Sequence, residues 1–183
     1  MIPSVKECFL YIEKYEMLEN IRAHSIIVEN VANIIARGLI EAGADLSIEK
    51  ITAGALLHDI GKSLCLKTGD DHAAKGEEIC LQNQLDEIAD MVREHITLES
   101  YELESAINEK EIIYYADKRV NHDSVVSLEE RLEYLLERYG RNNDHLCGLI
   151  RENFRMCKDV EMKLFNDLAF RPEALNQMVA EKD

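Results

Sequence analysis

The sequence predicts an all-α fold, because apolar residues recur at helical spacing along the chain and residues that break helices are scarce. The only two prolines of the 183 residues, Pro3 and Pro172, lie near the ends, so the interior is free to be helical. No useful length of sequence alternates between apolar and polar residues as a half-buried strand would. Because 46% of the residues are hydrophobic, a packed core is available. We expect a single domain over residues 1–183, built as a bundle of about eight helices.

The clearest helices lie in the first third of the chain. An apolar stripe at helical spacing passes through Ile21 and Val28, and Gly43 is a plausible stop for that helix. Ser47 is a candidate N-cap for the next helix, which Gly61 then ends. The helices predicted in this part of the chain cover residues 4–17, 19–41 and 48–59.

Five further helices follow a predicted loop over residues 67–71. His95 shares a helix face with apolar residues such as Val92, and Asp117 shares one with Ile113. The last two helices carry apolar stripes but no obvious chemistry, so their role is unassigned. The predicted ranges are 72–82, 85–95, 105–121, 128–139 and 144–165.

Charge and cysteine content narrow the class of partner and the compartment. With 21 Lys and Arg against 36 Asp and Glu, the formal charge is −15, which argues against a nucleic-acid polymer or an anionic membrane as partner. The five cysteines form no C-x-x-C pair, and we interpret them as small buried hydrophobes with reduced thiols. No signal pattern begins the sequence, and no apolar run reaches the ~18 residues of a membrane span. We therefore expect a cytoplasmic protein.

Polar residues at apolar positions indicate a metal site. His24, His95 and Asp117 each replace an apolar residue on an inward helix face, where an unpaired polar group costs about 1–3 kcal/mol. The adjacent pair His58 and Asp59 ends another apolar stretch. A shared site for divalent metals satisfies all of them together, because imidazole and carboxylate groups both bind such ions.

An ordered set of motifs carries a resemblance to a known family. HDIGK at residues 58–62 is followed by HAAKGEEI, VREHI and YYADKRV. This order resembles the HD superfamily of metal-dependent phosphohydrolases, and HDIGK is similar to its HDIG-type branch. The resemblance covers an HD metal-binding core at about residues 20–125, whereas residues 126–183 form C-terminal helices outside it. The most similar members that we identify are the bacterial symmetric dinucleoside-tetraphosphate hydrolases, although a short Asp59–His72 interval and the string KRVNHD depart from them.

The resemblance implies an all-helical HD domain holding two divalent metal ions, with iron as the first expectation and manganese or another first-row metal as the alternative. Asp59 bridges the two ions and, together with Lys62, belongs to the catalytic residues. The implied ligands are His24, His58, Asp59 and Asp117 for one metal and His72, His95 and Asp59 for the other.

The activity implied is hydrolysis of a phosphoester or phosphoanhydride, with a small phosphorylated substrate such as a nucleotide. Hydroxide attacks phosphorus in line in this hypothesis, and Lys62 contacts a non-bridging oxygen as a point charge. Lys118 and Arg119 are weaker candidates for phosphate contacts, and Arg93 is weaker still. His122 is interpreted as a surface or loop residue.

Three alternatives stay open. A di-iron oxygenase of the same fold uses the same six ligands, a mononuclear HD nucleotidase uses four of them, and a regulatory module retains an idle site. The C-terminal helices either cap the site, complete the core or form the contact of a homodimer. Oxygen uptake distinguishes the first alternative, and metal content distinguishes the second.

Overall fold

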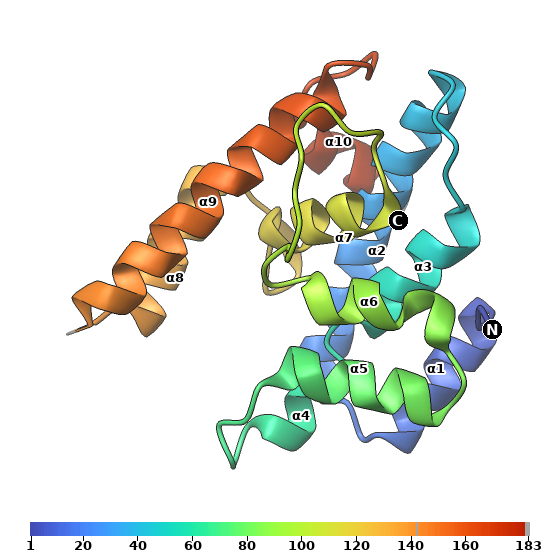
Figure 1. Cartoon of the computed structure of the whole chain (residues 1–183), viewed down its shortest axis with the longest axis vertical. Helices are drawn as coiled ribbons and strands as arrows, with labels where there is room; N and C mark the ends of the chain where they lie inside the picture. Colours follow the sequence, from blue (N-terminus) through green and yellow to red (C-terminus); the bar gives the residue numbers. More distant parts are fainter. Residues whose placement is uncertain (142, 182–183) are drawn as a thin grey trace.

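The all-α prediction is confirmed by a computed structural model, which describes residues 1–141 and 143–181. Nearly all regular structure in these residues is helical, and the only strands are two residues long. The helices run from α1 to α10 in Figure 1. They exceed the eight predicted because the short helices α4 and α10 were not among the predicted ranges. Their bounds are α1 Val5–Lys14, α2 Glu19–Glu41, α3 Ile48–Leu57, α4 Lys62–Cys65, α5 His72–Gln82, α6 Asp86–Glu94, α7 Glu109–Lys118, α8 Leu128–Tyr139, α9 Asp144–Phe165 and α10 Leu175–Ala180, preceded by a 3-10 turn at Pro172–Ala174.

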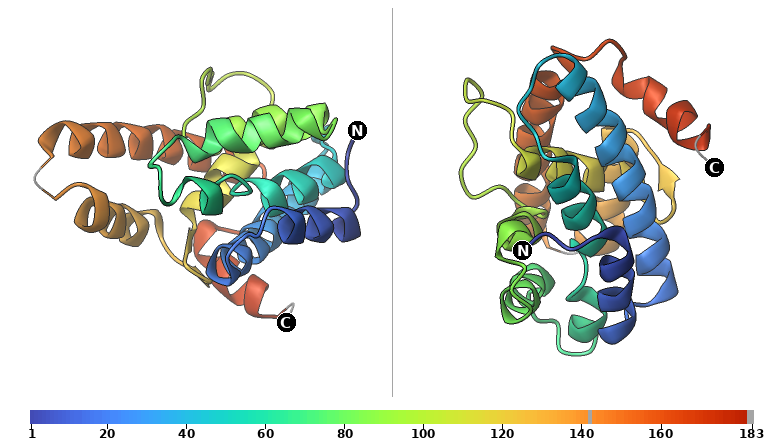
Figure 2. Two further views of the ribbon diagram at one scale, coloured as in Figure 1. Left: turned by 90° about the horizontal axis from the view of Figure 1, so that it is seen from below. Right: turned by 90° about the vertical axis from the view of Figure 1, so that its right-hand side faces the viewer.

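Helix α2 is the centre of the bundle. It packs against α3, α7 and α10, while α6 packs on α3 and α7 and pairs with α5 on its other side (Figures 1 and 2). The face that α2 turns inward carries fully buried aliphatic residues such as Val28, Val31 and Ile35. Removing these side chains from water supplies the main driving force for assembly of the bundle.

Helices α8 and α9 form an arm that projects from the bundle. The two helices pack on each other, and α9 lies against α7 along its C-terminal half and at Asn153, which accepts a hydrogen bond from the hydroxyl of Tyr114 (Figures 1 and 2). That half is anchored by Cys157, Val160 and Leu164, all of them fully buried. We refer to residues 128–165 as the α8–α9 arm.

The helix predicted over residues 105–121 is shorter at both ends than expected. Helix α7 begins only at Glu109, because the side chain of Asn108 accepts a hydrogen bond from the Glu111 backbone and the Glu111 carboxylate accepts one from Asn108. After Arg119 the chain reverses in a small antiparallel hairpin, β1 Val120–Asn121 with β2 Ser124–Val125. His122 lies at its turn with a positive φ of 56°.

Other predicted boundaries changed less. Helix α3 ends at Leu57 rather than at residue 59, so His58 caps it and Asp59 follows in a turn. Helices α4 and α10 were not predicted, because four and six residues are too few to show a helical period. The cysteines are free thiols, as expected, and all but Cys147 are buried. No helix in the described part of the chain combines the length and apolar character needed to cross a membrane.

Candidate metal centre

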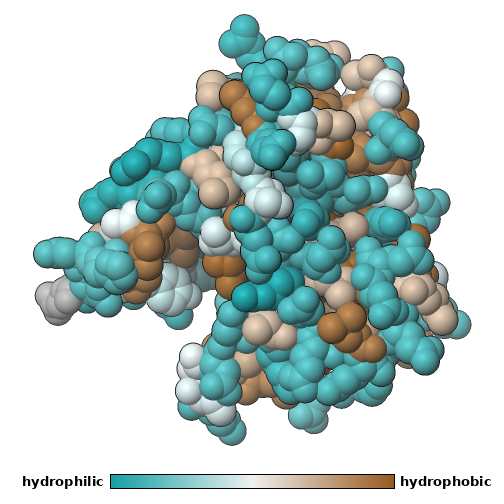
Figure 3. All heavy atoms as spheres, viewed as in Figure 1, coloured by the Kyte–Doolittle hydropathy of each residue, from teal (hydrophilic) through white to brown (hydrophobic). Residues whose placement is uncertain are grey.

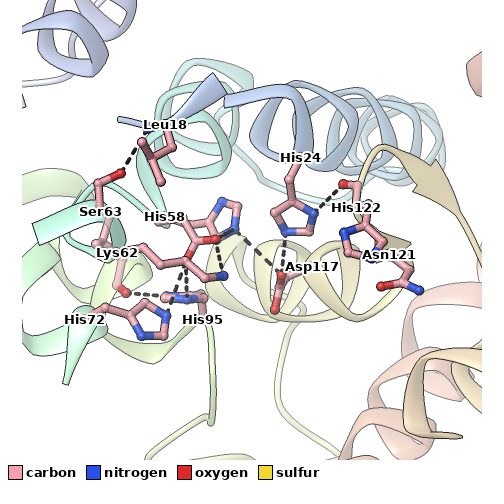
Figure 4. A network of polar contacts seen from close by, with 12 residues as sticks. Leu18, His24, His58, Lys62, Ser63, His72, His95, Asp117, Asn121 and His122 are labelled. Carbon is pink, nitrogen blue, oxygen red and sulfur yellow. Dashed lines mark hydrogen bonds and ion pairs between the residues drawn. The ribbon is translucent and has the colours of Figure 1, made fainter. Parts of the chain in front are cut away.

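Six side chains predicted as ligands come together from five parts of the chain (Figure 4). The first comes from helix α2, and an adjacent pair comes from the turn after α3. The N-terminus of α5 and the C-terminus of α6 supply one each, and the sixth comes from the last turn of α7. Most are buried, whereas the side chain of His72 is 25% exposed and that of Asp117 14%. The six residues, in chain order, are His24, His58, Asp59, His72, His95 and Asp117.

Asp59 lies between two groups of imidazoles. Its Oδ2 atom is 3.5 Å from Nε2 of His58, while its Oδ1 atom is 3.3 Å from Nε2 of His72 and 3.5 Å from Nε2 of His95. Each carboxylate oxygen therefore faces a different set of ring nitrogens. A carboxylate in this position is able to bridge two cations.

Asp117 completes the group on the His58 side. Its Oδ1 atom is 3.0 Å from Nε2 of His24 and 3.7 Å from Nε2 of His58. The side chains of His24, His58 and Asp59 offer ligand atoms that lie within 4.8 Å of one another, and so do those of Asp59, His72 and His95. Asp59 is thus common to two candidate cation sites.

Backbone carbonyls orient three of the imidazoles. The Nδ1–H of His58 donates to the Ala55 carbonyl at 2.7 Å, and that of His95 donates to Val92 at 2.7 Å. The Nδ1–H of His24 donates to the carbonyl of His122 at 2.9 Å. Because a carbonyl oxygen only accepts, Nδ1 carries the proton in each neutral ring, and the Nε2 lone pair is left for a cation.

Two buried polar atoms in the cluster have no hydrogen-bond partner, Nε2 of His58 and Oδ1 of Asp59. The side chains that carry them are 0% and 1% exposed. A buried polar atom left without a partner costs about 1–3 kcal/mol, so this arrangement is unfavourable unless something else binds these atoms. Both atoms face the interior of the cluster, and a divalent cation on each side of Asp59 would satisfy them. The donor set of imidazole nitrogens and carboxylate oxygens fits a first-row transition metal.

The electrostatics of the cluster favour ionised carboxylates. Burial raises the pKa of Asp59, but His58 and Lys62 outweigh it and hold that pKa well below its ordinary value. For Asp117, burial is likewise outweighed, chiefly by the positive charge of Lys118 and by the contact with His24, and its pKa is also well below the ordinary value. Burial lowers the pKa of His95 to about 4, which keeps the ring neutral near pH 7. Anionic carboxylates and a neutral imidazole are the forms that bind metals.

The basic residues named from the sequence occupy different positions. Lys62 lies at the cluster, where its Nζ donates to Oδ2 of Asp59 at 2.7 Å and its side chain is 33% exposed. Lys118 is buried and donates to the carbonyl of His95, and Arg119 holds the carbonyls of Val126 and Pro172, so both stabilise the fold rather than face a substrate. The fourth basic residue, Arg93 on α6, pairs with acidic side chains at the surface. Its partners are Asp71, Glu77 and Glu99.

A cleft of about 170 Å³ opens beside the cluster and is lined by His24, Asp59 and Lys62. Its opposite wall comes from the β1–β2 turn and from α8, which the sequence had left without a role. The α8 side chains involved recur at intervals of three and four residues, so the helical period of that segment was the available signal. The lining residues on this wall are Asn121, His122, Arg131, Tyr134, Leu135, Arg138 and Tyr139.

Comparison with known proteins identifies a family for the central part of the chain. Residues 21–121 match the HD domain model. Ribonuclease Y of Fervidobacterium nodosum is 36% identical over 78 residues, which are 42% of this chain and 14% of that protein. The tRNA (cytidine(56)-2'-O)-methyltransferase of Picrophilus torridus is 30% identical over 163 residues, which are 81% of this chain and 44% of that protein.

A third relative has a length similar to that of this chain. An uncharacterized protein of Methanocaldococcus jannaschii is 25% identical over 148 residues, which are 74% of this chain and 86% of that protein. By contrast, this chain spans less than half of the ribonuclease and of the methyltransferase. No solved structure matches the chain.

Proposed function

The chain belongs to the HD domain family, which implies a metal-dependent hydrolase, and we propose that it uses two divalent ions to hydrolyse a phosphoester or phosphoanhydride bond of a nucleotide. The observation that carries the proposal is the position of Asp59, whose two oxygens face separate groups of imidazoles. The unpartnered Nε2 of His58 and Oδ1 of Asp59 support it further.

The proposed ligand assignment follows the two groups. One ion binds His24, His58, Asp59 and Asp117, and the other binds His72, His95 and Asp59. Two ions of this kind, when bound, activate water near neutral pH and neutralise charge that develops on the phosphoryl oxygens. We propose iron as the natural metal, with manganese or another first-row ion as the alternative, because mixed imidazole and carboxylate ligands suit several of them.

Lys62 is proposed to contact the phosphoryl group that is cleaved. Its ammonium group lines the cleft and lies 2.7 Å from Asp59, so it serves the bridging carboxylate and the substrate from one position. As a compact charge on a flexible stem, lysine is able to follow a phosphoryl oxygen without a fixed hydrogen-bond geometry. Lys62→Arg should therefore retain more turnover than Lys62→Met, with metal content unchanged in both.

The proposed substrate is a small nucleotide rather than a polymer. Two relatives carry names that refer to RNA, which supports a ribonucleotide as the group recognised. The net charge of −15 opposes a long polyanion, because phosphate neutralisation by Lys and Arg supplies most of the affinity for such chains. The family match is to the HD domain in general and singles out no branch of the family. Dinucleoside tetraphosphates are therefore one set of compounds to screen among other nucleotides.

Metal content per chain tests the proposal. Protein purified without oxygen or chelators should contain close to two equivalents of iron or manganese, and His72→Ala or His95→Ala should reduce this to one. His145→Ala is the matched control, because this histidine is exposed on α9 and lies outside the cluster. Asp59→Asn should lower turnover by more than about 100-fold, since the loss of even an indirect metal contact costs about 10–100-fold.

Two results would replace the proposal. A single equivalent of metal that is insensitive to His72→Ala and His95→Ala would indicate a mononuclear nucleotidase. Oxygen consumption coupled to loss of an organic substrate by the iron-loaded protein would indicate an oxygenase.

A further inference from the structure

The cleft beside the metal centre has a wall that lies outside the family match. The match ends at residue 121, whereas α8 begins at Leu128. From the bundle the cleft is lined by the N-terminal turns of α2 and by α4, and from the other side by α8. Figure 3 shows the surface hollowed between the α8–α9 arm and the part of the bundle that carries α4 and α5. The arm thus supplies part of the candidate active site.

The wall is one face of α8. Its residues stand at positions i, i+3, i+4, i+7 and i+8, which share a helix face. Such a stripe normally packs apolar side chains into a core. Here it contains two arginines and two tyrosines, all of them half-buried or exposed and all lining the cleft. The stripe is Arg131, Tyr134, Leu135, Arg138 and Tyr139.

The two arginines lack a carboxylate partner among the described residues, although the chain has 36 acidic residues against 21 basic ones. The guanidinium of Arg131 donates to Oδ1 of Asn121 at 3.0 Å, while its buried Nε has no hydrogen-bond partner. The Nε of Arg138 donates to the hydroxyl of Tyr139 at 3.4 Å, and its guanidinium lies 5.6 Å from the centre of that ring. By comparison, Arg93 contacts three acidic side chains. In the described part of the chain, neither guanidinium on the cleft side of α8 is thus paired with a carboxylate within 4 Å.

The β1–β2 turn connects this wall to the metal centre. The backbone carbonyl of His122 accepts the hydrogen bond from Nδ1 of His24. The ring of His122 lies 5.3 Å from the ring of Tyr134. The preceding residue, Asn121, holds Arg131. One short turn therefore positions a candidate metal ligand on one side and the α8 face on the other.

The cleft continues along α8. A second cavity of about 350 Å³ shares Tyr134 and Arg138 with the first and adds Glu137 and Arg141. The space available to a ligand thus extends along α8 toward one further arginine, Arg141. A molecule with its reacting group at Asp59 has room to place a second group beside Arg138.

We propose that Arg131 and Arg138 form a second anion-binding subsite, which selects substrates that carry a phosphate group in addition to the one cleaved. The inference rests on the proposed function and deepens it: the substrate class becomes nucleotides with two or more linked phosphates, not monophosphate esters. Guanidinium groups suit this role, because their planar donors bind phosphate oxygens in pairs. The rings of Tyr134 and Tyr139 border the same space and offer apolar faces to the remainder of the ligand.

Calorimetric titration with two stable probes tests the subsite without any turnover. Methylenediphosphonate carries two linked phosphoryl groups and inorganic phosphate carries one. In the manganese-loaded 183-residue chain, the combined change Arg131→Gln and Arg138→Gln should weaken diphosphonate binding at least about tenfold, because charge-assisted hydrogen bonds are lost. Affinity for inorganic phosphate should stay the same. Arg155→Gln is the control, since it removes an equal charge from an exposed position of α9 outside the cleft.

The outcomes separate the subsite from the proposed function. Equal weakening for both probes, or none for either, would overturn the subsite. Arg131→Gln removes the hydrogen bond to Asn121 and could disturb the fold. In that case Arg138→Gln alone keeps the test intact, because the Arg138 side chain is exposed. The titrations are then repeated without metal. Diphosphonate binding that still depends on the two arginines would support the subsite even if the protein fails to bind two ions.

Discussion

The bundle and the α8–α9 arm hold their polar groups in different ways. In the bundle, the side chains of His58, Asp59 and His95 are almost fully buried, and ring nitrogens are fixed by backbone carbonyls. On the arm, Arg131 and Arg138 are half-buried or exposed, with few partners. Rigid placement suits groups that must hold a fixed geometry, whereas looser placement suits groups that contact a variable part of a ligand. The bundle is thus the part proposed to carry the reaction, and the arm is the part proposed to select the substrate.

One buried ion pair joins the two regions. Lys163 of α9 donates to the Glu111 carboxylate of α7 at 2.8 Å, and their side chains are 6% and 3% exposed. Lys163 also donates to the carbonyl of Glu102 and to the hydroxyl of Ser105, both at 3.1 Å. The pair thus connects the arm, α7 and the loop that precedes α7.

The largest expected effect comes from breaking this pair. Lys163→Met should lower the free energy of unfolding by about 3–5 kcal/mol, because Glu111 would remain buried without its partner. Lys158→Met is the control, since Lys158 pairs with Glu129 at 2.7 Å but both side chains are more than half exposed; its cost should be about 0–1 kcal/mol. Urea unfolding measures both. Equal costs would show that the arm is not held to the bundle by this contact.

An intermediate effect, on metal affinity, is expected from a substitution where α4 meets α5. A Cβ atom on Gly61 would collide with the carbonyl oxygen of His72 and would lie 2.7 Å from the backbone nitrogen of Gly76. Gly61→Ala should therefore move His72 away from Asp59 and weaken the proposed second ion by about 10–100-fold, as other losses of ligand orientation do. The first ion should be retained, because none of its ligands lies on α5, whose backbone the added Cβ atom would displace.

Metal titration followed by elemental analysis checks the Gly61→Ala result. Gly148→Ala on α9 is the matched control, because nothing lies within 4 Å of the added Cβ atom. Loss of both ions in Gly61→Ala would show that the two candidate sites are not independent. An unchanged affinity for both would show that His72 is not held by this contact.

The smallest expected loss of stability comes from removing the same capping motif in the bundle and in the arm. Ser127 caps α8 and Asn108 caps α7, each in a reciprocal pair with the glutamate three residues later. Ser127→Ala and Asn108→Ala should each cost about 1 kcal/mol. If arm and bundle unfold together, both variants should lower the melting temperature measured by circular dichroism. A melting temperature that falls only for Asn108→Ala would mean that the arm unfolds separately.

Much of this arrangement is readable from the sequence, for local reasons. Helix periods predicted the positions of α2, α5, α8 and α9 closely, because an amphipathic stripe is a property of neighbouring residues. The same periods indicated that His24, His95 and Asp117 face inward. The extent of α7 was less predictable, since the stop after Lys118 depends on the pairing of β1 with β2.

The sequence by itself determined an all-helical HD domain and the identity of a polar set that has to meet in its interior. Only the tertiary structure decided how that set is arranged: Asp59 between two groups of imidazoles, Lys118 and Arg119 turned into the fold, and Lys62 beside the carboxylate. It also decided that α8, which lies beyond the family match, faces the metal centre. The physical reason is that helical period fixes which face of a helix is buried, whereas the partner of that face depends on packing between segments far apart in the chain.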